Sequence, residues 1–241
     1  MNKINIQEII NKSVRGKRRK HHEQKTWYVS SLGSCLTANY LARKGIATKE
    51  FDDRTLRVFK VGNMFEDWLV EQVAEGEKDF ETQIGMGGKV VNGELIKSKK
   101  EDSEISGYAD LRIGNMIYEI KTKHSKAFWY MNKRHMGPNR QHEYQLWTYL
   151  KLLNKPEGRL VYLSKDDLAI LEYPVFLKDK ELESEVMNEI NILNEAWEKG
   201  LPPKPVEDKK DWRYKYCSNH KKHCLKQSKY LKVGGDNKNK K

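Results

Sequence analysis

A short stretch near the middle of the chain, GYADLRIGNMIYEIKTKH at residues 107–124, combines acidic and basic residues at strand-like spacing. Gly114-Asn115 is typical of a two-residue hairpin turn, because both residues tolerate positive φ. Such a turn places Asp110 directly opposite Glu119, and the alternation of side chains along a strand puts Lys121 on the same face as Glu119. We therefore expect two carboxylates and one ammonium group to meet on one side of a hairpin.

Two opposed carboxylates repel each other and destabilise a plain hairpin, so the pair indicates a nearby cation. Lys121 supplies one positive charge, and a divalent metal would supply two. Carboxylates, a backbone carbonyl and water are ligands that suit Mg²⁺ or Mn²⁺, and a metal held there activates water against a phosphodiester. Lys121 would then position the attacking water or neutralise the phosphate. A cross-strand salt bridge is the alternative explanation for Glu119 and Lys121, since 33% of the residues are charged.

The elements that must hold this hairpin follow from hydrophobic periodicity and turn signals. The 57–75 segment has Phe65, Trp68, Leu69 and Val73 at helical spacing, and Asn92-Gly93 marks a tight turn in the strand region. The order of the elements predicts an α/β domain, a mixed sheet flanked by helices. Helices are expected at 4–13, 30–44, 57–75, 139–153 and 178–199, and strands within 80–123 and at 158–163 and 168–175.

Charge and composition divide the chain of 241 residues into three parts. We predict a basic N-terminal arm at 1–26, one domain at 27–224 and a Lys-rich, disordered tail at 225–241. The formal net charge of +12 favours polyanionic partners, first nucleic acid and second an anionic membrane surface. No apolar run is long enough to span a bilayer, no apolar signal region opens the chain, and three cysteines do not suggest a secreted disulfide framework. We therefore expect a cytoplasmic protein.

Two motifs in this framework resemble a known family. Asp110 followed by Glu119-Ile120-Lys121, with the lead-in Gly107-Tyr108-Ala109, resembles the core of the PD-(D/E)XK nuclease superfamily. Gln145 and Tyr149 share a helix face and resemble the Q-x-x-x-Y motif of its RecB-like branch, which includes CRISPR-associated exonucleases with an iron–sulfur cluster. The resemblance implies a restriction-endonuclease-like fold with a helical N-terminal part and a C-terminal cysteine-containing segment. It also implies that this helix face lies beside the metal centre and approaches DNA.

A third motif, Gly62-Asn63-Met64-Phe65-Glu66, resembles the helical element that precedes the sheet in this family. RecB-type relatives place a metal-binding His at the position of Phe65, whereas phage-exonuclease-type relatives use a Glu, which Glu66 would provide. The implied metal ligands are therefore Glu66, Asp110, Glu119 and the Ile120 carbonyl. A solvated helix glutamate is the alternative interpretation of Glu66.

The cysteines extend the resemblance to the two ends of the domain. Cys35 resembles the early cysteine of the cluster-bearing branch, and Cys217 and Cys224 resemble its late ones, although Tyr214 stands where one of them belongs. Because a [4Fe–4S] cluster normally takes four thiolates, three arrangements are open. They are an iron–sulfur cluster with an exogenous fourth ligand, a zinc site completed by a histidine, and three buried thiols without metal. The nearby histidines are His220 and His223.

The leading hypothesis is a Mg²⁺- or Mn²⁺-dependent deoxyribonuclease. In it, Lys121 assists the attacking water, while Gln145 and Tyr149 contact or orient the substrate. The resemblance implies an exonuclease that acts on single-stranded DNA ends in repair, recombination, replication or CRISPR-type processing. The rival hypothesis is a catalytically inactive nucleic-acid-binding subunit with protein partners in a repair, replication or spacer-capture complex, and RNA is a third candidate substrate.

Overall fold

The fold is built around one mixed β-sheet. The structure, a computed structural model, describes residues 5–16, 23–46, 51–133, 136–216 and 224. Within these residues the sheet has seven strands in the order β3-β2-β4-β5-β6-β7, with β1 paired to β4. The predicted tail at 225–241 and parts of the predicted arm lie outside the described residues. The strands are β1 (Trp27–Tyr28), β2 (Phe80–Val91), β3 (Glu94–Lys97), β4 (Ile105–Ile113), β5 (Met116–Lys123), β6 (Glu157–Ser164) and β7 (Ile170–Phe176).

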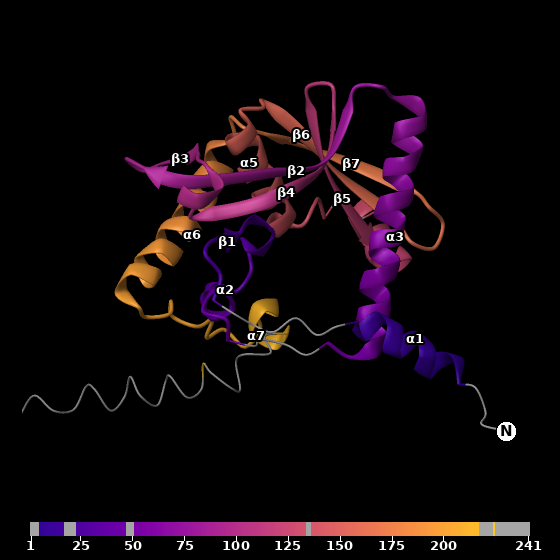
Figure 1. The fold of residues 1–241 in the computed structure, drawn as a ribbon, viewed down its shortest axis with the longest axis horizontal. Coiled ribbons are helices and arrows are strands. Elements are labelled where there is room, and N and C mark those ends of the chain that lie inside the picture. The colour runs from indigo at the N-terminus through magenta and orange to yellow at the C-terminus, as the bar shows by residue number, and fades with distance from the viewer. Residues whose placement is uncertain (1–4, 17–22, 47–50, 134–135, 217–223, 225–241) are drawn as a thin grey trace, which may run out of the picture.

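Helices cover both faces of this sheet. The large core places α5 against one face, and α6 packs beside it, whereas α3 stands on the other side of the sheet (Figure 1). The predicted class, an α/β fold with a mixed sheet flanked by helices, is confirmed. The described helices are α1 (Ile6–Arg15), α2 (Leu36–Arg43), α3 (Asp53–Gly76), α4 (Ser125–Lys133), α5 (Arg140–Leu153), α6 (Lys180–Lys199) and α7 (Trp212–Tyr216), with 3₁₀ turns at Val29–Ser31 and Lys100–Asp102.

The connection from β5 to β6 places α5 over the centre of the sheet. These two strands are parallel, so the chain must cross the sheet between them, which it does through α4 and α5. The face of α5 that meets the sheet is apolar and buried, with Leu146, Trp147 and Leu150 inaccessible to solvent. Gly158 of β6 permits this close packing, because a Cβ there would lie 3.1 Å from side-chain carbons of Leu146 and Leu150.

Two predicted helices differ from the expectation. The helix predicted at 30–44 is split into a 3₁₀ turn and α2, which begins after Cys35. Gly33 explains the break, because it adopts φ +76° and a Cβ there would lie 2.8 Å from the Cα of Gln141. The helix predicted at 57–75 starts earlier, at Asp53, because the side chain of Asp52 accepts a hydrogen bond from the Thr55 amide at 2.7 Å and caps it.

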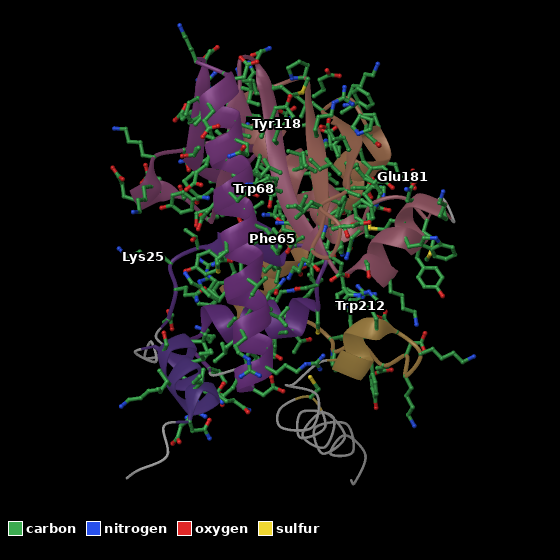
Figure 2. The ribbon with its side chains drawn as sticks, turned by 90° about the vertical axis from the view of Figure 1, so that its right-hand side faces the viewer. Lys25, Phe65, Trp68, Tyr118, Glu181 and Trp212 are labelled. Carbon is green, nitrogen blue, oxygen red and sulfur yellow. The ribbon has the colours of Figure 1, made fainter. Side chains whose placement is uncertain are left out.

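The long helix α3 packs on the sheet through only part of its apolar surface. Leu69 and Val73 contact a small cluster formed by the outer side of β4, β5 and β6. Trp68, which belongs to the same predicted apolar row, is instead 39% exposed (Figure 2). The basic N-terminal segment contributes α1, which packs on α3 and joins it through Arg15 and Asp53. No helix in the described part of the chain is both long and apolar enough to cross a membrane.

Candidate active site

The predicted β4–β5 hairpin is present with its predicted turn. Gly114-Asn115 connects the strands, and Gly114 adopts φ +54°. The pairs nearest the turn are Ile113 with Met116, Arg112 with Ile117, and Leu111 with Tyr118. The two-residue turn and its register are therefore confirmed.

The sheet becomes irregular at Asp110. The pairing of β4 with β5 does not continue to a backbone pair between Asp110 and Glu119, and the pairing with β2 passes over Asp110 and Gln83. Gln83 adopts φ +51°, and the alternation of sides breaks here, since Ala109 joins the core under α5 while Leu111 joins the cluster under α3. The directly opposed backbone pair expected from the turn is thus wrong in detail.

The side chain of Asp110 takes the place of the missing backbone acceptor. Its Oδ2 accepts a hydrogen bond from the amide of Ile120 at 2.8 Å. This bond turns the carboxylate toward β5, where it still interacts with the Glu119 carboxyl group and the Lys121 ammonium group. Burial raises the pKa of Asp110, and Lys121 and the Ile120 amide offset part of that effect.

Glu119 is the most deeply buried acid of the site. The residue is inaccessible to solvent. Its Oε1 accepts a hydrogen bond from Lys121, whereas its Oε2 has no hydrogen-bond partner within the described residues. Burial raises the pKa of Glu119 to about 8, with Lys121 opposing and Asp110 adding to the rise. A buried carboxylate oxygen without a partner is costly unless a cation or donor reaches it.

Lys121 is the cation that the hairpin itself supplies. Burial lowers its pKa, but the neighbouring Glu119 and Asp110 outweigh burial and leave the pKa raised. The ammonium group therefore stays charged at neutral pH. The predicted convergence of Asp110, Glu119 and Lys121 is present.

Glu66 approaches this group from α3. Its Oε1 accepts a hydrogen bond from Gln83 Nε2 at 3.3 Å. Burial and then Asp110 raise the pKa of Glu66 to about 7, while Lys121 opposes the rise. The close docking of α3 on β5 depends on Gly62, since a Cβ there would lie 3.2 Å from Thr122 Oγ1.

The donor set suits a hard divalent cation, although the ligands are not gathered around one point. Carboxylates with raised pKa values and an unpartnered oxygen on Glu119 are chemically suited to Mg²⁺ or Mn²⁺. Among the residues that the structure describes, however, no group of three His, Cys, Asp or Glu side chains is placed to hold a metal ion. The predicted ligand set of Glu66, Asp110, Glu119 and the Ile120 carbonyl therefore remains a proposal.

Gln145 and Tyr149 of α5 lie next to the site. Both are buried, and Gln145 Nε2 donates a hydrogen bond to Tyr149 Oη at 3.0 Å. Burial, with Glu119 nearby, raises the pKa of Tyr149. Gly107 makes room for this ring, because a Cβ there would lie 2.8 Å from Tyr149 Cε1. Tyr149 therefore lies near Glu119, and a contact of Gln145 or Tyr149 with substrate stays a prediction.

A second cluster beside Lys121 was not predicted from the sequence. His142 Nδ1 lies 2.8 Å from the hydroxyl of Tyr162 on β6, and Lys123 lies over the same tyrosine ring. His142 precedes Gln145 by three residues on α5, so the two share a helix face. That spacing was the available sequence signal for this residue.

The predicted cysteine site is only partly described. Cys35 occupies the N-cap position of α2 without a side-chain capping bond and is buried, as is Cys224, while Cys217 lies outside the described residues. The two ends of the domain do meet here, because Thr37 Oγ1 donates a hydrogen bond to the Pro203 carbonyl at 3.0 Å. Binding of iron or zinc at these cysteines remains a prediction.

The chain is similar in fold to a solved structure. The chain has 23% sequence identity to the crystal structure of SSO0001, with a TM-score of 0.56 over 89% of this chain and 93% of that one. The sheet topology of the chain is that of a mixed α/β fold, consistent with the restriction-endonuclease-like architecture.

Two exonuclease structures are more distant in shape. An alkaline exonuclease (LHK-Exo) from Laribacter hongkongensis is 14% identical, with a TM-score of 0.47 over 73% of this chain and 92% of that one. A phage-related exonuclease from Haemophilus somnus 129PT is 12% identical, with a TM-score of 0.37 over 58% of this chain and 70% of that one. No family model and no curated protein matches the sequence.

Proposed function

We propose that this protein is a divalent-metal-dependent nuclease that hydrolyses DNA. The observation that carries the proposal is the buried Glu119, which lies beside a second carboxylate at Asp110. Its Oε1 accepts a hydrogen bond from Lys121, and its Oε2 has no partner among the described residues. A cation at the open oxygen would relieve the cost of burying two acids side by side. The sequence resemblance to PD-(D/E)XK nucleases rests on these same residues.

Each residue of the site would have a separate role in the reaction. Glu66, Asp110 and Glu119 would hold Mg²⁺ or Mn²⁺ with the Ile120 carbonyl, and the bound ion would supply Lewis-acid stabilisation and an acidified water. Lys121 keeps its proton and would orient the attacking water or neutralise the phosphate.

The rest of the site would bind and orient. Gln145 and Tyr149 would hold the hairpin in position from behind. The net charge of +12 would attract the polyanionic substrate. Digestion from single-stranded ends, in DNA repair, recombination, replication or CRISPR-type processing, is the finer proposal that the RecB-like motifs support.

A cleavage assay tests the proposal directly. Labelled single-stranded DNA, duplex DNA and RNA are incubated with the protein in Mg²⁺, Mn²⁺ or chelator. We expect cleavage of DNA that requires metal and that is lost in Lys121→Ala. The matched control is Lys89→Ala, which removes a half-buried strand lysine from the β2–β3 hairpin and should leave cleavage unchanged.

A second candidate function is favoured by one observation. The described residues contain no ready-made three-ligand metal group, and Phe65 stands where RecB-type relatives carry a histidine. These features suit a nucleic-acid-binding subunit without turnover, which would work with protein partners. Binding of DNA without any metal-dependent cleavage would select this candidate over the nuclease.

We also propose that Cys35, Cys217 and Cys224 bind an iron–sulfur cluster or zinc near the joined ends of the domain. The burial of Cys35 and Cys224 is the supporting observation. Metal analysis of anaerobically purified protein distinguishes iron from zinc. Absence of both from fully folded protein would reject the site.

A further inference from the structure

Two groups that bind anions lie against the ring of Tyr162, and a third belongs to the neighbouring strand. The imidazole of His142 lies against it, with ring centroids 5.6 Å apart, and the Lys123 ammonium group lies 5.6 Å from the same ring centroid. Lys121 is the direct neighbour of Tyr162 in the parallel pairing of β5 with β6. Glu119, Lys121 and Lys123 alternate along β5 and so share one face of the sheet. The cluster is therefore continuous with the proposed active site.

The hydroxyl of Tyr162 selects the tautomer of His142. Tyr162 Oη accepts a hydrogen bond from the backbone amide of Asn139 at 3.1 Å and lies 2.8 Å from His142 Nδ1. Because the amide already donates to that oxygen, the hydroxyl donates its own proton to Nδ1, since a buried donor without an acceptor is costly. The ring proton of His142 then resides on Nε2, which leaves an N–H donor beside the two lysines.

His142 is neutral, and Lys123 has no acidic partner in the part of the chain that the structure describes. Burial, Lys121 and Lys123 lower the pKa of His142 to about 3. Burial and Lys121 also lower the pKa of Lys123, and within the described residues Lys123 forms no salt bridge. An anionic oxygen bound here would accept a hydrogen bond from the neutral N–H group and form an ion pair with the ammonium group.

We propose that His142 and Lys123 bind a backbone phosphate of the nucleic-acid substrate, one nucleotide away from the phosphodiester at Lys121. Alternate residues on a strand lie about 6.5 Å apart, which suits successive phosphates of an extended single strand. His142 donates its Nε2–H to a phosphate oxygen, and Lys123 supplies the charge. The inference rests on the proposed function, because it assumes the same substrate, but it concerns binding and not turnover.

The experiment measures affinity for a labelled single-stranded oligonucleotide in chelator, so that no cleavage takes place. We expect His142→Ala to weaken binding about tenfold, as for a lost hydrogen bond to a charged group. His142→Gln should retain most of the affinity, because its amide nitrogen reaches about as far as Nε2. Tyr162→Phe removes the hydroxyl that fixes the tautomer of His142 but keeps the ring, so it should give an intermediate loss of affinity.

The salt dependence of oligonucleotide binding distinguishes the contribution of His142 from that of Lys123. Because His142 contributes no charge, His142→Ala should leave the slope of log affinity against log salt unchanged. Lys123→Ala should reduce the magnitude of that slope by about 0.7, the value for one phosphate contact on a single strand. The matched control is Tyr173→Phe, since this ring packs on Tyr162 with centroids 5.8 Å apart from the neighbouring strand and should leave affinity unchanged.

Each outcome decides the inference. Wild-type affinity in His142→Ala, a changed salt slope in that variant, or failure of His142→Gln to rescue a correctly folded protein would overturn it. Thermal unfolding of every variant shows whether a loss of affinity reflects a loss of fold. If the wild type binds DNA but never cleaves it with metal, the nuclease proposal fails. The affinity ratios of the variants then still decide whether His142 and Lys123 bind a phosphate.

Discussion

The substitution Gly107→Ala tests how the hairpin and α5 are fitted together. A Cβ at position 107 would lie 2.8 Å from Tyr149 Cε1 and 3.0 Å from the Cβ of Val29. Both neighbours are in the core, with Tyr149 1% exposed and Val29 inaccessible to solvent. Neither side chain has free space to move into, so the added methyl group must displace the tyrosine, the strand or both.

The expected loss is that of an overpacked core. Inserting one methyl group into a well-packed core costs about 1–3 kcal/mol, and for a chain of this size each kcal/mol lowers Tm by about 2–4 °C. We therefore expect Gly107→Ala to lower the free energy of unfolding by about 2 kcal/mol and Tm by about 4–8 °C. Urea unfolding and calorimetry measure both quantities.

Gly85→Ala is the matched control on the neighbouring strand. A Cβ at Gly85 would lie 3.0 Å from the ring of Tyr108, which is a similarly close contact. Tyr108 is 57% exposed, however, and can turn into solvent. We expect this variant to be as stable as the wild type. Equal stability of the two variants would refute the inference that Gly107 is needed to seat Tyr149.

Further predictions concern charge. Because burial raises the pKa of Glu119 to about 8 from 4.5, the native protein keeps a proton that the unfolded chain releases between these values, and stability falls as pH rises through this window. Glu119→Gln should remove this pH dependence, so its free energy of unfolding should gain on that of the wild type as pH rises from about 5 to about 8. Urea unfolding in chelator measures this difference. Mg²⁺ should raise the Tm of the wild type and do so less in Glu119→Gln, and equal shifts would argue against a metal at this acid. Arg43 lies between two tryptophan rings, 4.2 Å from the Trp27 centroid and 4.0 Å from that of Trp197, so Arg43→Ala should cost about 2 kcal/mol of unfolding free energy and Arg43→Lys less.

The hairpin could be predicted from the sequence because its determinants are local. A Gly-Asn pair fixes the turn, the turn fixes the register, and strand alternation then fixes which side chains share a face. The packing of Leu69 and Val73 of α3 on the sheet followed from helical periodicity in the same way. The N-terminal cap at Asp52 is also a local signal, although the predicted helix began too late.

Other features depend on contacts between distant segments. Trp68 fits the apolar row of α3 but is exposed, because periodicity does not say how much of a helix surface the sheet covers. Gly33 breaks the helix predicted at 30–44 where the backbone approaches α5, which the sequence of that segment alone does not reveal. The partnership of His142 with Tyr162 joins a helix to a strand twenty positions away, and only the β5–β6 crossover brings them together.

The irregularity at Asp110 explains how the hairpin can hold two acids next to each other. A regular ladder would satisfy every backbone amide and leave both carboxylates to repel each other across the strands. Here the Ile120 amide instead binds the Asp110 carboxylate, and Lys121 binds one oxygen of Glu119. Each acid is thereby fixed through the protein's own donors, while Glu119 Oε2 has no hydrogen-bond partner among the residues that the structure describes. Asp110 and Glu119 are thereby held next to each other by the protein's own donors, although the described residues form no three-ligand group for a metal ion.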